Sequence, residues 1–234
     1  MATATEIKVI SANAMREVIA GTKVEFEAAS GHRLNVTVVE TGEIRRRVLA
    51  GEPFDVIMVP RSVVEELERQ GKLVPGSAAA LVRINFGLAV RADGPRPDVS
   101  TPEALRRTFL AANTVLITDP ATGGVSGVHL MEVLEKLGIA ETMRSKLVLN
   151  RGSGHHAARV VKGEADLAVQ AEHEIRCVPG AAFLDYPKEF RRSIVFVGAI
   201  GAASAELAAA KAYLAFIAGP QATPAIKAKG LSPA

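Results

Sequence analysis

The sequence predicts an α/β fold built from two lobes, and three observations lead to this prediction. Short apolar runs typical of buried strands alternate with patterns typical of helices. The strand patterns occur in two sets, one before residue 80 and one after residue 114. Two strand-like passages, residues 80–91 and 193–200, can each carry the chain from one set to the other. We therefore expect mixed, mainly parallel sheets joined by two crossover strands.

The first set of elements is bounded by clear stop signals. Asn13 is a candidate N-cap for the first helix, and Gly31 ends that helix. The next two helices end at Gly51 and Gly71. In chain order we expect a strand over 7–12, a helix over 14–29, a strand over 34–39, a helix over 43–50, a strand over 55–59 and a helix over 62–70.

The second set opens with a helix start at Thr101-Pro102-Glu103. These three residues supply a capping side chain, a proline at the first helical position and an acid in the first turn. The later strands are expected over 114–118, 165–170, 181–184 and 193–200, and the later helices over 128–137, 157–162, 206–217 and 220–229.

Composition excludes several classes of function. The net charge is only +3 over 234 residues, and aromatic residues make up 4% with no tryptophan, so a basic, base-stacking surface for nucleic acid is not expected. No uncharged apolar window of about 18 residues predicts a membrane span. No signal-peptide pattern opens the sequence, so it indicates a cytoplasmic protein as it stands, or a periplasmic one if a signal peptide has been removed.

The loops that follow strands carry the candidate binding residues, because ligands of α/β sheets bind where strands end and helices begin. Ser11 and Asn13 follow the first strand, where they either contact a ligand or simply cap the helix. Thr41 can cap the next helix, while Gly42 allows a ligand close to the backbone. Arg45 lies within reach of an anion, although residues 45–47 also fit a solvated helix face.

The most informative loop runs from Thr118 to Gly127. It leaves a strand and enters a helix with three glycines and several hydroxyl groups, which favours exposed N–H donors for an oxyanion. It matches neither the phosphate-binding P-loop nor the dinucleotide fingerprint. The ligand candidates in this loop are Thr122, Gly123, Gly124 and Ser126.

Further candidates follow residue 150. Ser153 lies in a glycine-rich helix start, and Gln170 ends a strand with an amide donor. His155 and His156 are candidate catalytic groups only if the protein is an enzyme, and otherwise they are helix-cap histidines. Adjacent histidines do not make a metal site, so no metal and no cofactor are expected. The single cysteine, Cys177, is interpreted as a structural or incidental thiol.

The order of several segments resembles molybdate-binding-protein-like substrate-binding proteins, which have the type II periplasmic-binding-protein fold. The segments are Ile7 to Asn13, Thr41-Gly42, the Gly51-Glu52-Pro53-Phe54-Asp55-Val56 block, the Thr122 to Gly127 loop and the closing Ile226 to Leu231. The resemblance implies one lobe of residues 1–82 plus 195–234, a second lobe of residues 83–194, and a ligand held between them. The Thr122 loop is also similar to the branch that includes aconitate isomerase.

Three functions remain open at this point. The first is a solute-binding protein that captures a small oxyanion or organic acid anion by hinge closure, monomeric and served by an ABC transporter permease if exported. The second is an intracellular isomerase of an unsaturated polycarboxylate, with Arg45, His155 and His156 as possible site groups. The third is a cytosolic ligand-sensing module that acts through a partner chain.

Overall fold

The computed structural model describes residues 4–150 and 155–234. The chain forms two compact units, one of Met1–Ile84 with Ile194–Ala234 and the other of Asn85–Ser193. We call them unit 1 and unit 2. The chain therefore passes between the units twice, within strand β4 (Ala79–Arg91) and at the start of strand β9 (Ser193–Ile200). The mixed α/β class expected from the sequence is confirmed.

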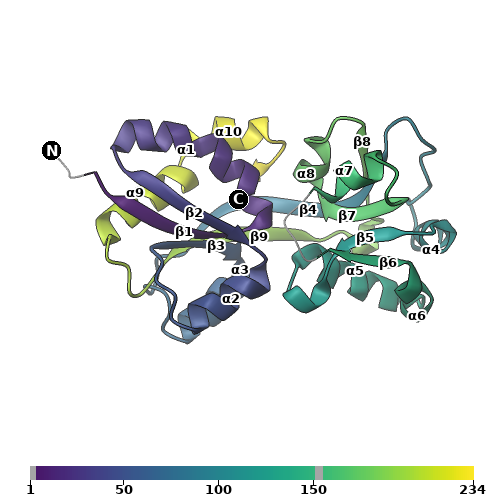
Figure 1. Cartoon of the computed structure of the whole chain (residues 1–234), viewed down its shortest axis with the longest axis horizontal. Helices are drawn as coiled ribbons and strands as arrows, with labels where there is room; N and C mark the ends of the chain where they lie inside the picture. The colour runs from purple at the N-terminus through teal and green to yellow at the C-terminus, as the bar shows by residue number, and fades with distance from the viewer. Residues whose placement is uncertain (1–3, 151–154) are drawn as a thin grey trace. The chain divides into compact units, whose positions relative to one another are not determined.

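Unit 1 is built on a sheet with the strand order β2-β1-β3-β9. Strands β2 and β3 both pair with β1 in parallel, while β9 runs antiparallel to β3. Figure 1 shows α1 and α10 on one side of this sheet, with α2 and α3 on the other. The elements of unit 1 are β1 (Glu6–Ala12), the 3-10 turn η1 (Asn13–Met15), α1 (Arg16–Ser30), β2 (Arg33–Val39), α2 (Thr41–Leu49), β3 (Val56–Pro60), α3 (Arg61–Arg69), α9 (Leu207–Ala218), η5 (Pro220–Ala222), α10 (Thr223–Ala228) and β10 (Ser232–Pro233).

The core of unit 1 explains why these segments fold together. All five residues of β3 are buried, as expected for a strand that is covered on both faces. Phe26 of α1 packs on Tyr213 of α9, with 4.8 Å between the ring centroids. Burial of such aromatic side chains stabilises the fold by about 1.5–3 kcal/mol each. This contact therefore joins α1 to α9 within the core of unit 1.

Unit 2 has its own mixed sheet, in which β6 and β7 both pair with β5 in parallel. Strand β4 runs antiparallel to β7 and to β8. The elements of unit 2 are α4 (Pro102–Ala111), β5 (Val115–Thr118), η2 (Pro120–Thr122), α5 (Val125–Lys136), α6 (Ala140–Met143), η3 (Arg144–Lys146), β6 (Leu147–Asn150), α7 (His156–Val161), β7 (Leu167–Ala171), α8 (Glu172–Arg176), β8 (Ala181–Asp185) and η4 (Lys188–Phe190).

Strand alternation divides the core of unit 2 into two layers. Val115 and Ile117 of β5 belong to the cluster that includes α4, α5 and α6 residues, whereas Leu116 between them belongs to the cluster with α7 and α8 residues. Strand β7 alternates in the same way. Since successive side chains of a strand point to opposite faces, helices cover both faces of this sheet.

Candidate functional site

The carboxyl ends of the parallel strands in unit 1 meet at one edge of its sheet. Ser11 of β1 lies opposite Val38 of β2 and Met58 of β3. A helical element follows each of these strands. It begins at Asn13 directly after β1, at Thr41 one residue after the end of β2, and at Arg61 directly after β3. The candidates Ser11, Asn13, Thr41 and Gly42 therefore gather at this edge, as the strand pattern predicts.

Two buried hydroxyl groups lie at this edge. Ser11 is fully buried, and its hydroxyl donates to the neighbouring Ala12 carbonyl over 3.3 Å. Thr41 is 7% exposed and is the first residue of α2. The N-cap of α2 is Glu40, which makes no side-chain hydrogen bond to the helix. The first N–H groups of α2 thus lack a capping acceptor from that residue, a condition that favours an anion.

The capping roles predicted for Asn13 and Thr41 are wrong. Asn13 lies inside η1, and α1 begins at Arg16 after an N-cap at Met15. Its side chain instead donates from Nδ2 to Glu40 Oε1 over 2.6 Å and accepts from Arg16 Nη2 over 3.1 Å. Thr41 is inside α2 rather than before it. The side chain of Asn13 thus bonds to Glu40, 27 residues away in the chain, and to Arg16.

Glu40 is a further candidate site residue, which was not among the residues predicted from the sequence. It is half-buried at the carboxyl end of β2, next to Thr41. Its pKa is raised above the ordinary value, because burial disfavours the charged form more than the Asn13 hydrogen bond and the Arg16 charge favour it. The sequence signal that could have indicated Glu40 is its position, as an acid directly before the helix start at Thr41-Gly42. A perturbed carboxyl at such an edge marks a candidate functional group.

Arg45 is engaged by a neighbouring helix. Its Nη2 lies 2.7 Å from Glu66 Oε1 of α3. Arg46 and Arg47 pair with Glu43 on their own helix. The positive charges of Arg45, Arg46 and Arg47 are therefore largely balanced by acids of α2 and α3. This fits the alternative that residues 45–47 form a solvated helix face.

The corresponding edge of unit 2 is formed by the carboxyl ends of β5, β6 and β7. After β5, Thr122 Oγ1 donates to the Asp119 carbonyl over 2.7 Å and Gly123 adopts a left-handed conformation with φ of 72°. Gly124 is the N-cap of α5 and has no side chain to cap it. The N-cap residue therefore supplies no acceptor to the first N–H groups of α5, a condition that favours an external anion.

Ser126 and Gly127 fix how α5 approaches β5. Ser126 is 7% exposed, and its Oγ lies 3.2 Å from Thr118 Oγ1. A Cβ placed on Gly127 would lie 1.9 Å from the Thr118 carbonyl oxygen. Only glycine allows this approach, which places the Ser126 hydroxyl in the first turn of α5 at the strand end.

His156 and Gln170 hold α7 against β7. His156 is 4% exposed, and its Nδ1 donates to the Val169 carbonyl over 3.2 Å. Its Nε2 therefore accepts from Asn150 Nδ2, also over 3.2 Å. Gln170 Oε1 accepts from the Ala157 N–H over 3.0 Å. Both ring nitrogens of His156 are thus occupied by protein groups, whereas His155 precedes α7 and is partly exposed.

Ser153 lies outside the described residues. Cys177 is exposed directly after α8. Within residues 4–150 and 155–234, no group of three or more His, Cys, Asp or Glu side chains is placed to hold a metal ion. No helix in the same ranges has the length and apolar character of a membrane span.

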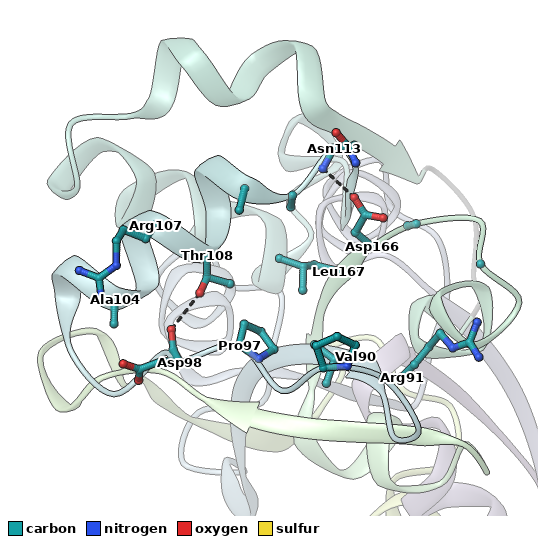
Figure 2. A pocket seen from close by; sticks show the side chains of 16 residues that line it. Val90, Arg91, Pro97, Asp98, Ala104, Arg107, Thr108, Asn113, Asp166 and Leu167 are labelled. Atoms are coloured by element: carbon teal, nitrogen blue, oxygen red, sulfur yellow. Dashed lines mark hydrogen bonds between the residues drawn. The ribbon is translucent and has the colours of Figure 1, made fainter.

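A separate pocket of about 740 Å³ lies at the opposite edge of the unit 2 sheet (Figure 2). It is lined by the residues just before β5 and β7, and thus lies away from the loops described above. Its acids are already satisfied: Asp166 accepts from the Asn113 N–H over 2.6 Å and Asp98 from the Ser100 N–H over 2.9 Å. Its arginines, Arg91 and Arg107, face Asp93 and Glu103. Among the described residues that line this pocket, there is no buried hydroxyl group beside a helix start like those at the carboxyl ends of the parallel strands.

Two α/β units, with anion-type donors at the carboxyl edges of their parallel strands, define the class of two-lobed solute-binding proteins. The sequence comparison is more specific. Residues 7–232 match the family model described as bacterial extracellular solute-binding protein, and the chain belongs to that family.

Individual relatives include proteins that handle anions. An aconitate isomerase from Pseudomonas sp. is 28% identical over 98% of this chain and 88% of its own length. The molybdate-binding protein ModA from Rhodobacter capsulatus is 28% identical over 88% of this chain and 79% of its own length. The solved periplasmic molybdate-binding protein from Azotobacter vinelandii superposes with a TM-score of 0.80 at 22% identity, covering 97% of this chain and 98% of that chain. That last likeness concerns the fold.

Proposed function

We propose that this protein is a solute-binding protein that captures a small oxyanion or organic acid anion. The carrying observation is that both units place a buried hydroxyl and an uncapped helix start at the carboxyl ends of parallel strands. Ser11 and Thr41 supply the hydroxyls in unit 1, and Ser126 supplies one in unit 2. Hydroxyl and backbone N–H donors bind an anion without requiring a buried counter-charge.

The named functions of the relatives support an anionic ligand. One relative is named for molybdate and another for aconitate, a polycarboxylate. The inorganic oxyanion and the organic acid share negatively charged oxygens, which is the chemistry that these donors recognise. Capture by closure of the two lobes stays a prediction. For the cellular context, we propose that the protein acts as a monomer and, after export, delivers its ligand to an ABC transporter permease.

A thermal-shift panel tests the proposal. The panel contains molybdate, tungstate, sulfate, citrate, malonate and both isomers of aconitate, each at the same ionic strength. A ligand at one hundred times its Kd adds about 2.7 kcal/mol to the free energy of unfolding. We expect at least one of these anions to raise the melting temperature saturably. No stabilisation by any of them would count against anion capture.

A second candidate function is isomerisation of an unsaturated polycarboxylate. It is favoured by the match to aconitate isomerase, which spans 98% of this chain. Proton NMR of cis- and trans-aconitate incubated with the protein distinguishes the two functions. A binding protein leaves the ratio of isomers unchanged, whereas an isomerase brings both starting mixtures to the same ratio.

A further inference from the structure

One feature of the unit 1 edge conflicts with simple anion capture, namely a carboxyl group among the donors. Glu40 follows the last paired residue of β2 and precedes Thr41 of α2. Its Oε1 accepts from Asn13 Nδ2 over 2.6 Å, so the carboxyl reaches across to the end of β1. That strand end also carries the buried Ser11 hydroxyl. The carboxyl is therefore positioned beside the groups proposed to hold the anion.

Two like charges in such a place repel each other strongly. An ionised carboxyl within about 4–6 Å of an anion disfavours the charged form of both groups, and partial burial strengthens the effect. Arg16 offsets part of this repulsion through Asn13, whose Oδ1 accepts from Arg16 Nη2 over 3.1 Å. The Arg16–Asn13–Glu40 chain thus holds the carboxyl in place through two hydrogen bonds, with Asn13 between the carboxyl and the guanidinium.

Two other charged groups on the helices that begin at this edge are already paired. Glu43 in the first turn of α2 pairs with arginines of the same helix, and Arg45 pairs with Glu66 of α3. Arg61 lies exposed at the first residue of α3. Burial also raises the pKa of Glu40, while Asn13 and Arg16 lower it, with a net increase. Glu40 is therefore the group at this edge that responds most directly to an added negative charge.

We infer that Glu40 and the bound anion share one proton, so the site selects basic carboxylate anions over oxyanions that hold a proton poorly, such as sulfate. When the anion binds, one proton from solvent is taken up, and a Glu40 O–H···O⁻ hydrogen bond forms to a ligand carboxylate. The O–H bond formed on Glu40 replaces the bond to hydrogen that breaks in the hydronium ion or buffer acid supplying the proton, and no other covalent bond changes. The inference rests on the proposed function, because it requires that the anion bind at this edge.

The test is the pH dependence of affinity, with trans-aconitate and sulfate as probes. Isothermal titration calorimetry from pH 6 to pH 9 is carried out on the wild-type protein, Glu40→Gln and Glu43→Gln. Glutamine keeps the size of Glu40 and an oxygen that can accept from Asn13, but it cannot ionise. Glu43→Gln is the matched control, because it removes a carboxyl from the same helix turn that is already paired with arginine.

For the wild type and Glu43→Gln we expect trans-aconitate affinity to fall by up to about tenfold per pH unit once free Glu40 is ionised. Glu40→Gln should bind with a nearly pH-independent affinity, and therefore more tightly than the wild type at pH 9. Sulfate should bind more weakly than trans-aconitate to the wild type, with a smaller difference in Glu40→Gln.

Failure of the shared-proton inference can be distinguished from failure of the proposed function. If trans-aconitate binds the wild type and Glu40→Gln with the same pH dependence, the shared proton is refuted while anion capture stands. If neither probe nor any other panel anion binds the wild type, the proposed function and this inference both fail. If Glu40→Gln does not fold, Asn13→Asp places a second carboxyl beside Glu40. This variant should shift the onset of the pH dependence to higher pH, because a neighbouring negative charge raises the pKa of Glu40; an unchanged onset would overturn the inference.

Discussion

Gly127 approaches the Thr118 carbonyl so closely that a Cβ on Gly127 would lie 1.9 Å from the Thr118 oxygen. This contact joins the first turn of α5 to the end of β5. It explains why the glycine-rich loop is part of the architecture and not merely a flexible connection. The position of Ser126 depends on the same contact, since Ser126 precedes Gly127 in the helix.

Gly127→Ala is expected to force α5 away from β5. Overpacking of this kind costs about 1–3 kcal/mol, and the helix start should lose its alignment for anion binding. Urea unfolding and calorimetry with the best panel anion measure the two effects. Gly94→Ala is the control, because its Cβ would meet Arg91 Cβ at an ordinary 3.5 Å. A Gly127→Ala protein as stable as Gly94→Ala would refute the packing argument.

Ser126→Ala is expected to weaken anion binding without a large loss of stability. A hydrogen bond to a charged group contributes about 1.5–3 kcal/mol, which corresponds to about a 10- to 100-fold change in Kd. Ser100→Ala is the control, because it removes a serine hydroxyl in the same unit that donates to nearby Asp98. Equal Kd values for the two variants would exclude Ser126 from the site.

Arg45→Gln is expected to have a smaller effect on anion affinity than Ser126→Ala, since its guanidinium lies on Glu66. The pair is partly exposed, so breaking it should lower the free energy of unfolding by less than about 1 kcal/mol. Glu66→Gln breaks the same pair from the other side. An affinity loss for Arg45→Gln larger than that for Ser126→Ala would show that Arg45 leaves Glu66 to bind the ligand.

The free energy of unfolding should fall as the pH drops below about 6.5, the ordinary pKa of histidine. His156 is one cause of this decrease. The folded protein lowers the pKa of His156, chiefly by burial and despite the Val169 hydrogen bond, so the unfolded chain binds the proton first. The free energy of unfolding therefore decreases as protons are added. His156→Asn keeps a donor for the Val169 carbonyl but cannot titrate. Urea unfolding between pH 5 and pH 8 should give a smaller pH slope for this variant than for the wild type.

Much of the fold followed from local signals. Glycines at the helix ends and the Thr101 cap, whose hydroxyl accepts from the Ala104 N–H, marked boundaries that the structure reproduces closely. The helix α8 and the strand β6 were missed. Each is only four or five residues long, too short to show a helical or strand period.

The candidate site was predictable in position but not in detail. Strand ends located Ser11, Thr41 and Ser126, because parallel strands bring their carboxyl ends together. The role of Glu40 depends on its contact with Asn13, and that of His156 on the Val169 carbonyl. Such contacts join residues that are far apart in the chain or on different elements. No local pattern in the sequence reports them.

The most direct test of anion capture is a crystal structure of the protein grown with tungstate, whose anomalous scattering locates the anion, and a second one grown with trans-aconitate. We expect an anion within hydrogen-bond distance of the Ser11 or Ser126 hydroxyl, at the carboxyl ends of the parallel strands. An anion found only in the pocket lined by Arg91 and Arg107, at the opposite edge of the unit 2 sheet, would contradict this expectation.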